Sequence, residues 1–257
     1  MPVVFCLYSP PRGGVILAQV SKNEIFKQLN KELKVKASAE YAERNKGVIN
    51  SNHQLLGVKV PDLRQIALDF KNNYKGAVDF DDVCRLASRL WRGRYHDQRK
   101  LALTILEKYT RYFDEQSWEM LDEWIDDADA WDLIDQLSVS LLGKILLNDM
   151  GRLEEVRQWT KSDNFWRRRA SCAACVALVH GKHNYAEEAL SVGGLLIKDN
   201  HEMVRKAVVW LLREVSRKAP DDVYSLLLKN KDDAPRFLLR EASKKLSDLQ
   251  KMELLVR

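Results

Sequence analysis

The recurrence of one short motif constrains the fold of this chain more than any other feature. The motif is a basic residue, any residue and then alanine, and each copy opens an apolar segment: Lys100-Leu101-Ala102, Arg168-Arg169-Ala170, Arg205-Lys206-Ala207 and Arg240-Glu241-Ala242. The motifs begin 68, 37 and 35 residues apart, so one copy is missing near position 134, halfway through the first interval. A period of this length with two helices per unit is typical of HEAT or armadillo α-solenoids.

The chain reads as helical from about residue 22 onward. Apolar residues recur at the helical period in the segments 98–112, 117–125, 130–147, 166–179, 203–215 and 237–249. Pro61 and Pro220 are expected at helix ends, and polar turns at 162–164 and 199–200 separate paired helices. We therefore predict an all-α fold, an α-solenoid of HEAT-like helical repeats with a concave basic groove. We expect it to form a single domain over residues 21–257.

Two features exclude other classes of protein. Residues 3–8 and 15–20 are apolar, but Pro10-Pro11-Arg12-Gly13-Gly14 interrupts them, so the segment is too short and too broken for a signal peptide or a membrane span. We expect a disordered tail over residues 1–20 and no membrane association. Cys172-Ala173-Ala174-Cys175 has redox or metal spacing, but no second Cys pair or suitably spaced His pair accompanies it. Buried, reduced cysteines in a cytoplasmic protein without a metal or cofactor are expected instead.

Charge is distributed unevenly along the chain. The net charge is +5, and residues 161–257 carry 19 Lys and Arg against 13 Asp and Glu. The window Asp114–Asp135 holds ten carboxylates and neither Lys nor Arg. A basic half beside an acidic segment suits a polyanionic partner, with local chemistry on a cation. An ordinary solvated surface would have the same composition.

The segment at the missing repeat position is a candidate site. Trp131 and Asp135 are four residues apart and hence lie on one face of a helix. The corresponding helices of the next units carry Arg168, Arg169, Trp210 and Arg213, which would share one groove. Arginines can clamp phosphates, and aromatic faces can contact a sugar or a base. In the alternative interpretation, the tryptophans fill the core and the arginines pair with carboxylates of the acidic window.

A set of motifs over roughly Tyr41 to Leu249 resembles the DNA alkylation repair family, the HEAT-like alkylpurine DNA glycosylases of the AlkD type. Each motif is weak alone, but all of them occur in the family's order. They are Leu55-Leu56-Gly57-Val58-x-Val60-Pro61-x-Leu63-Arg64, Trp91, Gln98-Arg99-Lys100-Leu101-Ala102-Leu103, Ala130-Trp131-Asp132-x-x-Asp135, Ser162-Asp163-Asn164-x-Trp166-x-x-Arg169-Ala170 and Arg205-Lys206-Ala207-x-x-Trp210-x-Leu212-Arg213-Glu214.

The resemblance implies a monofunctional DNA glycosylase of base excision repair, which hydrolyses the N-glycosidic bond of N3- or N7-alkylated purines. The family's catalytic residues map onto Asp135, Trp131 and Trp210. Its DNA contacts map onto Arg169, Arg213 and Tyr41, while Arg168 and Arg167 leave the arginine assignment open by a residue. The implied partner is double-stranded DNA with alkylated bases, bound by a monomer. The alternative is a non-catalytic HEAT-repeat module that binds DNA structures or scaffolds proteins.

The implied chemistry is consistent with the residues present. A purine alkylated at N3 or N7 is cationic and already a good leaving group, so a general acid is unnecessary. One carboxylate near C1′ can stabilise the developing oxocarbenium charge and orient the attacking water. Tryptophan faces favour a cation and exclude bulk water. No lysine stands out as a Schiff-base nucleophile, so hydrolysis without strand cleavage is expected.

Overall fold

The computed structural model describes residues 21–256, which form helices and no β-strands. The predicted N-terminal tail, residues 1–20, lies outside the described residues. The helices are α1 (Lys22–Val35), α2 (Ala39–Ile49), α3 (Val60–Asn73), α4 (Phe80–Trp91), α5 (His96–Leu106), α6 (Glu115–Asp127), α7 (Trp131–Asp135), α8 (Gly143–Asn148), α9 (Leu153–Trp159), α10 (Phe165–His180), α11 (Ala186–Leu195), α12 (Glu202–Val215), α13 (Pro220–Lys229), α14 (Arg236–Ala242) and α15 (Asp248–Leu255). The π-helical segment η2 (Gln136–Leu142) joins α7 to α8, and the single 3-10 turns are η1 (Thr110–Tyr112), η3 (Met150–Arg152) and η4 (Ser243–Lys245).

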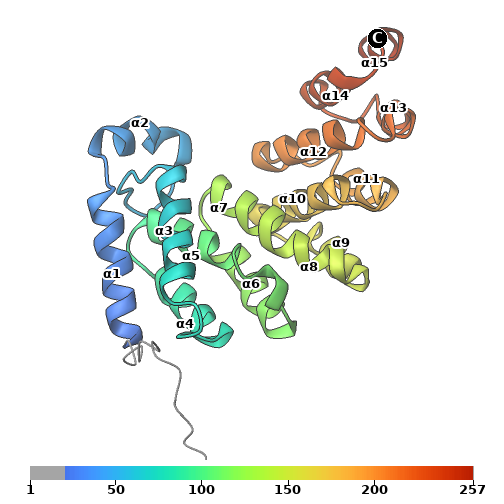
Figure 1. The fold of residues 1–257 in the computed structure, drawn as a ribbon. Helices are drawn as coiled ribbons and strands as arrows, with labels where there is room; N and C mark the ends of the chain where they lie inside the picture. The colour runs from blue at the N-terminus through green and yellow to red at the C-terminus, as the bar shows by residue number, and fades with distance from the viewer. Residues whose placement is uncertain (1–20, 257) are drawn as a thin grey trace, which may run out of the picture.

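The helices follow one another along an arc, as the repeat pattern predicts (Figure 1). In that view α6, α9, α11 and α13 lie on the outer side of the arc, whereas α7, α10 and α12 lie nearer its inside. The motif alanines are all fully buried on the second helices of the pairs: Ala102, Ala170, Ala207 and Ala242. Small side chains at these positions let neighbouring helices approach closely. The predicted α-solenoid is confirmed.

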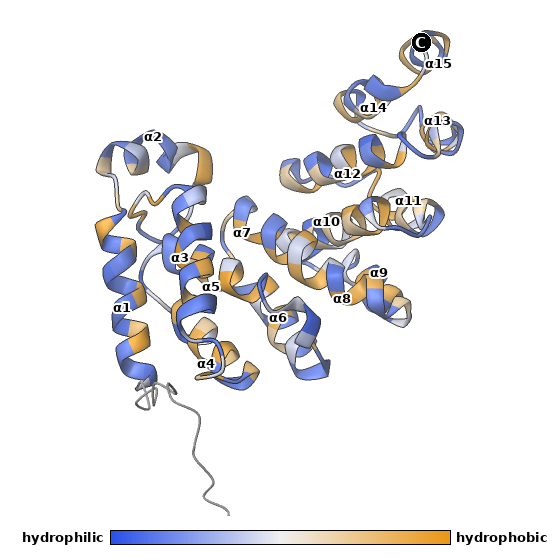
Figure 2. Cartoon of the chain, in the orientation of Figure 1, coloured by the Kyte–Doolittle hydropathy of each residue, from blue (hydrophilic) through white to orange (hydrophobic). Residues whose placement is uncertain are grey.

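Hydrophobic and hydrophilic residues lie on different sides of most helices (Figure 2). The buried apolar sides form one core, and four of its members are stacked tryptophans. Trp91 stacks on Trp124 at 4.5 Å between ring centroids, and Trp118 stacks on Trp159 at 5.5 Å. Within residues 21–256, no helix is long and apolar enough to cross a membrane, and no cluster of His, Cys, Asp or Glu could hold a metal ion.

The segment between α2 and α3 is fixed by a buried carboxylate. Asp97 of α5 accepts hydrogen bonds from the backbone N–H groups of Leu56, at 2.6 Å, and Val58, at 2.7 Å. Gly57 between them has φ +79°, and a Cβ there would lie 2.2 Å from the carbonyl oxygen of Ser38. Only glycine fits this position. These contacts explain the Leu-Leu-Gly-Val motif and attach α2 to the body of the solenoid.

The predicted continuous helix over 130–147 is interrupted by the π-helical segment η2. This wider turn begins directly after Asp135 and ends at Leu142, directly before Gly143. A Cβ on Gly143 would lie 2.5 Å from the Cβ of Ala177, so the backbones of α8 and α10 approach closely there. Single π-turns inserted into α-helices are frequent at functional sites. The repeat is therefore interrupted in the structure at the same place as in the sequence.

Candidate functional site

Asp135 and Arg169 form a bidentate ion pair on the inner helices. The Nε and Nη2 groups of Arg169 donate to the two carboxylate oxygens of Asp135, each at 2.8 Å. The Nη1 group of Arg169 donates to the backbone carbonyl of Met203 at 2.6 Å. One buried guanidinium thus joins α7, α10 and α12. Such forked, charge-assisted pairs fix geometry as well as charge.

The Asp135 carboxylate is mostly buried, with 19% of its side chain exposed. Burial raises the pKa of Asp135 above its ordinary value, and the negative charge of Asp132 adds to this. The hydrogen bonds and charge of Arg169 and the charge of Lys100 lower the pKa and partly offset the rise. The site therefore holds a desolvated carboxylate whose charge depends on neighbouring cations.

Asp132, one turn before Asp135, has its own partners on α5. Its carboxylate lies 3.1 Å from Nε2 of His96 and 3.4 Å from the ammonium of Lys100. Lys100 also donates to the backbone carbonyl of Asp132 at 3.2 Å. Burial acts to raise the pKa of Asp132, but His96 and Lys100 outweigh it, and the pKa lies below its ordinary value.

Trp131 stands at the wall of a cavity of about 670 Å³. Its indole Nε1 donates to the carbonyl of Val48 at 2.9 Å, which joins α7 to the end of α2. We call this space the aromatic cavity; it is lined by Ile49, Asn50, Asn52, Asp126, Asp127, Ala128, Asp129, Trp131, Phe165, Trp166, His201 and Met203. It is formed by the end of α2 and the beginnings of α7, α10 and α12. The inner side of the arc is thus hollowed beside Trp131.

The aspartate Asp129 holds the chain that follows α2 against this cavity. One of its carboxylate oxygens accepts from Ser51 Oγ at 2.9 Å and from the backbone N–H of Asn52 at 2.6 Å, and lies 3.1 Å from His53 Nδ1. Burial acts to raise the pKa of Asp129, but these hydrogen bonds outweigh it and lower the pKa. These contacts attach the segment after α2, at the rim of the cavity, to the turn between α6 and α7.

The acidic window pairs with arginines of the next repeat, as the alternative interpretation of the sequence had it. Arg167 binds Asp122 at 2.7 Å and Asp126 at 2.6 Å. Arg168 binds Asp199 at 2.7 Å and also donates to the carbonyl of Ser162. Since Arg169 binds Asp135, the whole Arg167–Arg169 run donates to protein acceptors. A DNA phosphate at Arg168 or Arg169 would have to compete with these carboxylates.

The remaining predicted residues lie on α12 and α2. Trp210 is half-buried on α12, packs against the core and is not among the residues that line the aromatic cavity. Arg213, one turn further on, is half-buried and has no ion pair within residues 21–256. Tyr41 is half-buried on α2, seven residues before Val48 and thus about 10 Å along the helix from it. Of the predicted residues, Asp135 and Arg169 are in direct contact, and Trp131 lies one turn before Asp135 on α7.

Sequence reasoning missed Phe165 and His201 as cavity residues. Their rings stack at 3.7 Å between centroids, at the beginnings of α10 and α12. They are 36 residues apart, one repeat, and Trp131 lies 34 residues before Phe165. The repeat register could therefore have placed the three rings at equivalent positions. Trp166 was part of a quoted motif, but no role followed from it.

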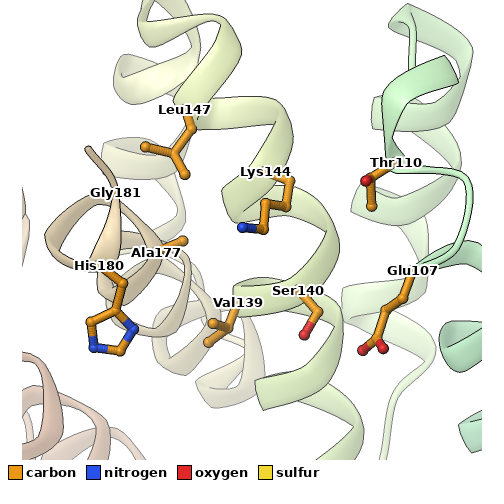
Figure 3. Close-up of a pocket in the computed structure, with 9 residues that line it drawn as sticks. All are labelled: Glu107, Thr110, Val139, Ser140, Lys144, Leu147, Ala177, His180 and Gly181. Carbon is orange, nitrogen blue, oxygen red and sulfur yellow. The ribbon is translucent and has the colours of Figure 1, made fainter. Parts of the chain in front are cut away.

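A second hollow of about 390 Å³ lies further along the inner helices. Its lining comes from the segment that follows α5, from η2 and α8, and from the end of α10, as Figure 3 shows: Glu107, Thr110, Val139, Ser140, Lys144, Leu147, Ala177, His180 and Gly181. Lys144 is exposed and has no ion pair among the described residues, whereas His180 pairs with Glu214. This part of the inner surface thus has both a negative group, Glu107, and a positive group, Lys144.

The profile of the DNA alkylation repair enzymes matches residues 29–246 of this chain. The chain belongs to the DNA alkylation repair enzyme family. The match spans α1 to the end of η4 and so includes every residue of the site described above. The resemblance indicated by the sequence motifs is confirmed at the level of the family. Among curated proteins, no sequence match was found.

Solved structures of this family's type share the fold. A predicted DNA alkylation repair enzyme from Enterococcus faecalis superposes with a TM-score of 0.72 at 15% identity, covering 83% of this chain and 98% of that one. AlkD2 from Streptococcus mutans gives 0.63 at 21% identity, covering 89% and 100%. The Pseudomonas fluorescens alkylpurine DNA glycosylase AlkC, bound to DNA containing an abasic site analogue, gives 0.54 at 16%, covering 90% and 66%. At these identities the likeness concerns the fold.

Proposed function

We propose that this member of the DNA alkylation repair family is a monofunctional DNA glycosylase. Its substrate would be duplex DNA carrying N3- or N7-alkylated purines, and its reaction the hydrolysis of the N-glycosidic bond. The observation that carries the proposal is the bidentate Asp135–Arg169 pair on the inner helices, with Trp131 one turn before Asp135 on α7. The AlkC glycosylase, which has the same fold and is bound to DNA, supports DNA as the partner.

Asp135 would stabilise positive charge on the sugar. A carboxylate offers about four lone-pair positions, and Arg169 takes one on each oxygen. The remaining positions can accept a water that attacks C1′ as the base departs. Because Asp135 is mostly buried, its field acts through little intervening water. Arg169 would keep the carboxylate oriented while the base departs and while the water attacks C1′.

The aromatic residues would serve the cationic base and sugar. Trp131 offers an indole face whose ring edge is held by Val48, so its orientation is fixed before substrate binds. Trp210, half-buried two turns beyond Met203 on α12, would contact the substrate from the other wall of the groove. A departing base that is already cationic needs no proton, and none of the residues at Asp135 is assigned the role of general acid.

DNA backbone contacts would come first from Arg213, which is free of ion pairs within residues 21–256. Tyr41 on the exposed helix α2 would approach the lesion from the opposite arm. Arg168 and Arg169 would reach phosphates only by sharing donors with Asp199 and Asp135. We propose a monomer that acts in the cytoplasm, where the buried thiols of Cys172 and Cys175 stay reduced.

The decisive experiment incubates the protein with duplex DNA carrying N7-methylguanine or N3-methyladenine and measures the released base. Matched duplexes with uracil, 1,N6-ethenoadenine and 8-oxoguanine serve as controls, because these bases are neutral. Release of only the cationic bases supports the proposal, and efficient release of a neutral base would contradict its charge-driven mechanism. Duplex binding without release from any lesion would favour the second candidate, a non-catalytic DNA-binding or scaffold module, in which the Asp135–Arg169 pair is purely structural.

A further inference from the structure

Two carboxylates of α7 are each paired with a cation from a neighbouring helix. Asp132 and Asp135 lie one turn apart, with side chains 16% and 19% exposed. Arg169 is bound to Asp135 from α10, and Lys100, 14% exposed, is bound to Asp132 from α5. The other carboxylates of the preceding turn have their own partners: Asp126 has Arg167, Asp127 has Arg99 and Asp129 has His53. Lys100 is the one Lys or Arg that pairs with Asp132 among the described residues.

His96, at the start of α5, is a second partner of the Asp132 carboxylate. Its side chain is 3% exposed, and its Nε2 faces the Asp132 carboxylate at 3.1 Å. Because the ionised carboxylate only accepts hydrogen bonds, Nε2 must be the donor. The backbone N–H of His96 donates to the carbonyl of Gln54, and no side-chain partner is present for Nδ1. The imidazole therefore holds Asp132 in the position where Lys100 can reach both it and the turn that carries Asp135.

We propose that Lys100 is a positioning residue for Asp135, held by Asp132 and His96, and that its ammonium keeps the Asp135 carboxylate ionised within the groove. This inference rests on the proposed function for its catalytic consequence. Lys100 would not contact DNA or the reacting atoms. Its effect would pass through the charge of Asp135 and the orientation of α7, which it fixes by donating to the Asp132 carbonyl.

The geometry predicts shifts of opposite sign for two neighbouring substitutions. The charged groups that act on Asp135 are Arg169 from α10, Asp132 from α7 itself and Lys100 from α5. Lys100→Met removes a cation, so ionisation of Asp135 becomes harder and its pKa rises. Asp132→Asn removes a like charge, so the pKa falls. A loss of packing would not produce this reversal, since both variants would then change in the same direction.

The test measures the titration of Asp135 in two independent ways. The first is ¹³C NMR of the side-chain carboxyls, with the Asp135 signal identified by its absence in Asp135→Asn. The second is the acid limb of the pH–rate profile for release of N7-methylguanine. Lys100→Met should move both midpoints up by about one pH unit, and Asp132→Asn should move both down. Lys100→Arg should restore the wild-type values, and Lys229→Met, on the outer helix α13, should leave them unchanged.

Unchanged midpoints in both variants, or shifts in the same direction, would overturn the proposal. If Lys100→Met fails to fold, Asp132→Asn alone must still lower the NMR midpoint. If the wild-type protein releases no base, the proposed function fails, yet the NMR titration still decides whether Lys100 sets the charge of Asp135. The two failures are therefore distinguishable.

Discussion

Replacing Arg169 by methionine separates a structural arginine from a phosphate ligand. Methionine retains much of the apolar stem but removes the guanidinium that binds Asp135 and the carbonyl of Met203. The side chain of Arg169 is only 6% exposed, so the carboxylate it leaves behind stays largely out of water. We expect a loss of stability and of base release rather than a simple weakening of DNA binding.

The size of the effect follows from this burial. Removing one partner of a buried ion pair typically costs about 3 to 5 kcal/mol, because the other charge is left uncompensated. For a chain of this length that corresponds to a fall in Tm of roughly 6 to 20 °C. The folded-state pKa of Asp135 already lies above its unfolded value, and losing Arg169 raises it further. An acid of this kind loses stability as pH rises through its folded pKa, so the deficit should be larger at pH 8 than at pH 5.

Urea unfolding at both pH values measures this difference directly. Arg205→Met is the matched control, since Arg205 is half-buried on α12 and has no ion pair within residues 21–256; its cost should stay under about 1 kcal/mol. Wild-type stability in Arg169→Met, together with a salt dependence of duplex binding shallower by about one phosphate contact, would refute the reasoning. Arg169 would then be a DNA ligand.

Further outcomes follow from two other features. Arg213→Ala should weaken binding to all duplexes alike and make the log–log salt slope shallower by about one, while leaving the Tm within a few degrees; an unchanged slope would remove Arg213 from the DNA path. Burial raises the pKa of Cys172 to about 12 and that of Cys175 well above its ordinary value. Iodoacetamide at pH 8 should therefore modify neither thiol in the native protein and both in urea, as read by peptide mass mapping; labelling of the native protein would mean that α10 opens.

The sequence predicted the fold because the repeat has a simple physical basis. Ala102, Ala170 and Ala207 recur where neighbouring helices approach closely, and each is fully buried. Pro220 begins α13 and Pro61 lies in the first turn of α3, as expected of proline at helix starts. The break in the repeat also pointed to Trp131 and Asp135, which the structure joins to Arg169 and to the aromatic cavity.

The partners of the site residues could not be predicted, because they depend on contacts between repeats. Arg168 and Arg169 are neighbours in the same motif, yet they bind different partners. Arg168 binds Asp199, in the turn between α11 and α12, whereas Arg169 binds Asp135 of the preceding repeat. A shift of one residue rotates a side chain by about 100° around the helix, which decides its partner. The pairing of Lys100 with Asp132 arises in the same way, from two helices that are distant in sequence.

The most direct test of the account is the rate of N7-methylguanine release by Asp135→Asn in single-turnover conditions. Asparagine keeps the shape and one acceptor for Arg169 but removes the negative charge. We expect base release to fall by at least about 10²-fold, in line with the loss of one electrostatic stabiliser, while the affinity for duplex DNA is retained. Thermal unfolding of the same sample shows that the variant is folded. Release at the wild-type rate by the folded variant would contradict the central role given to the Asp135 carboxylate.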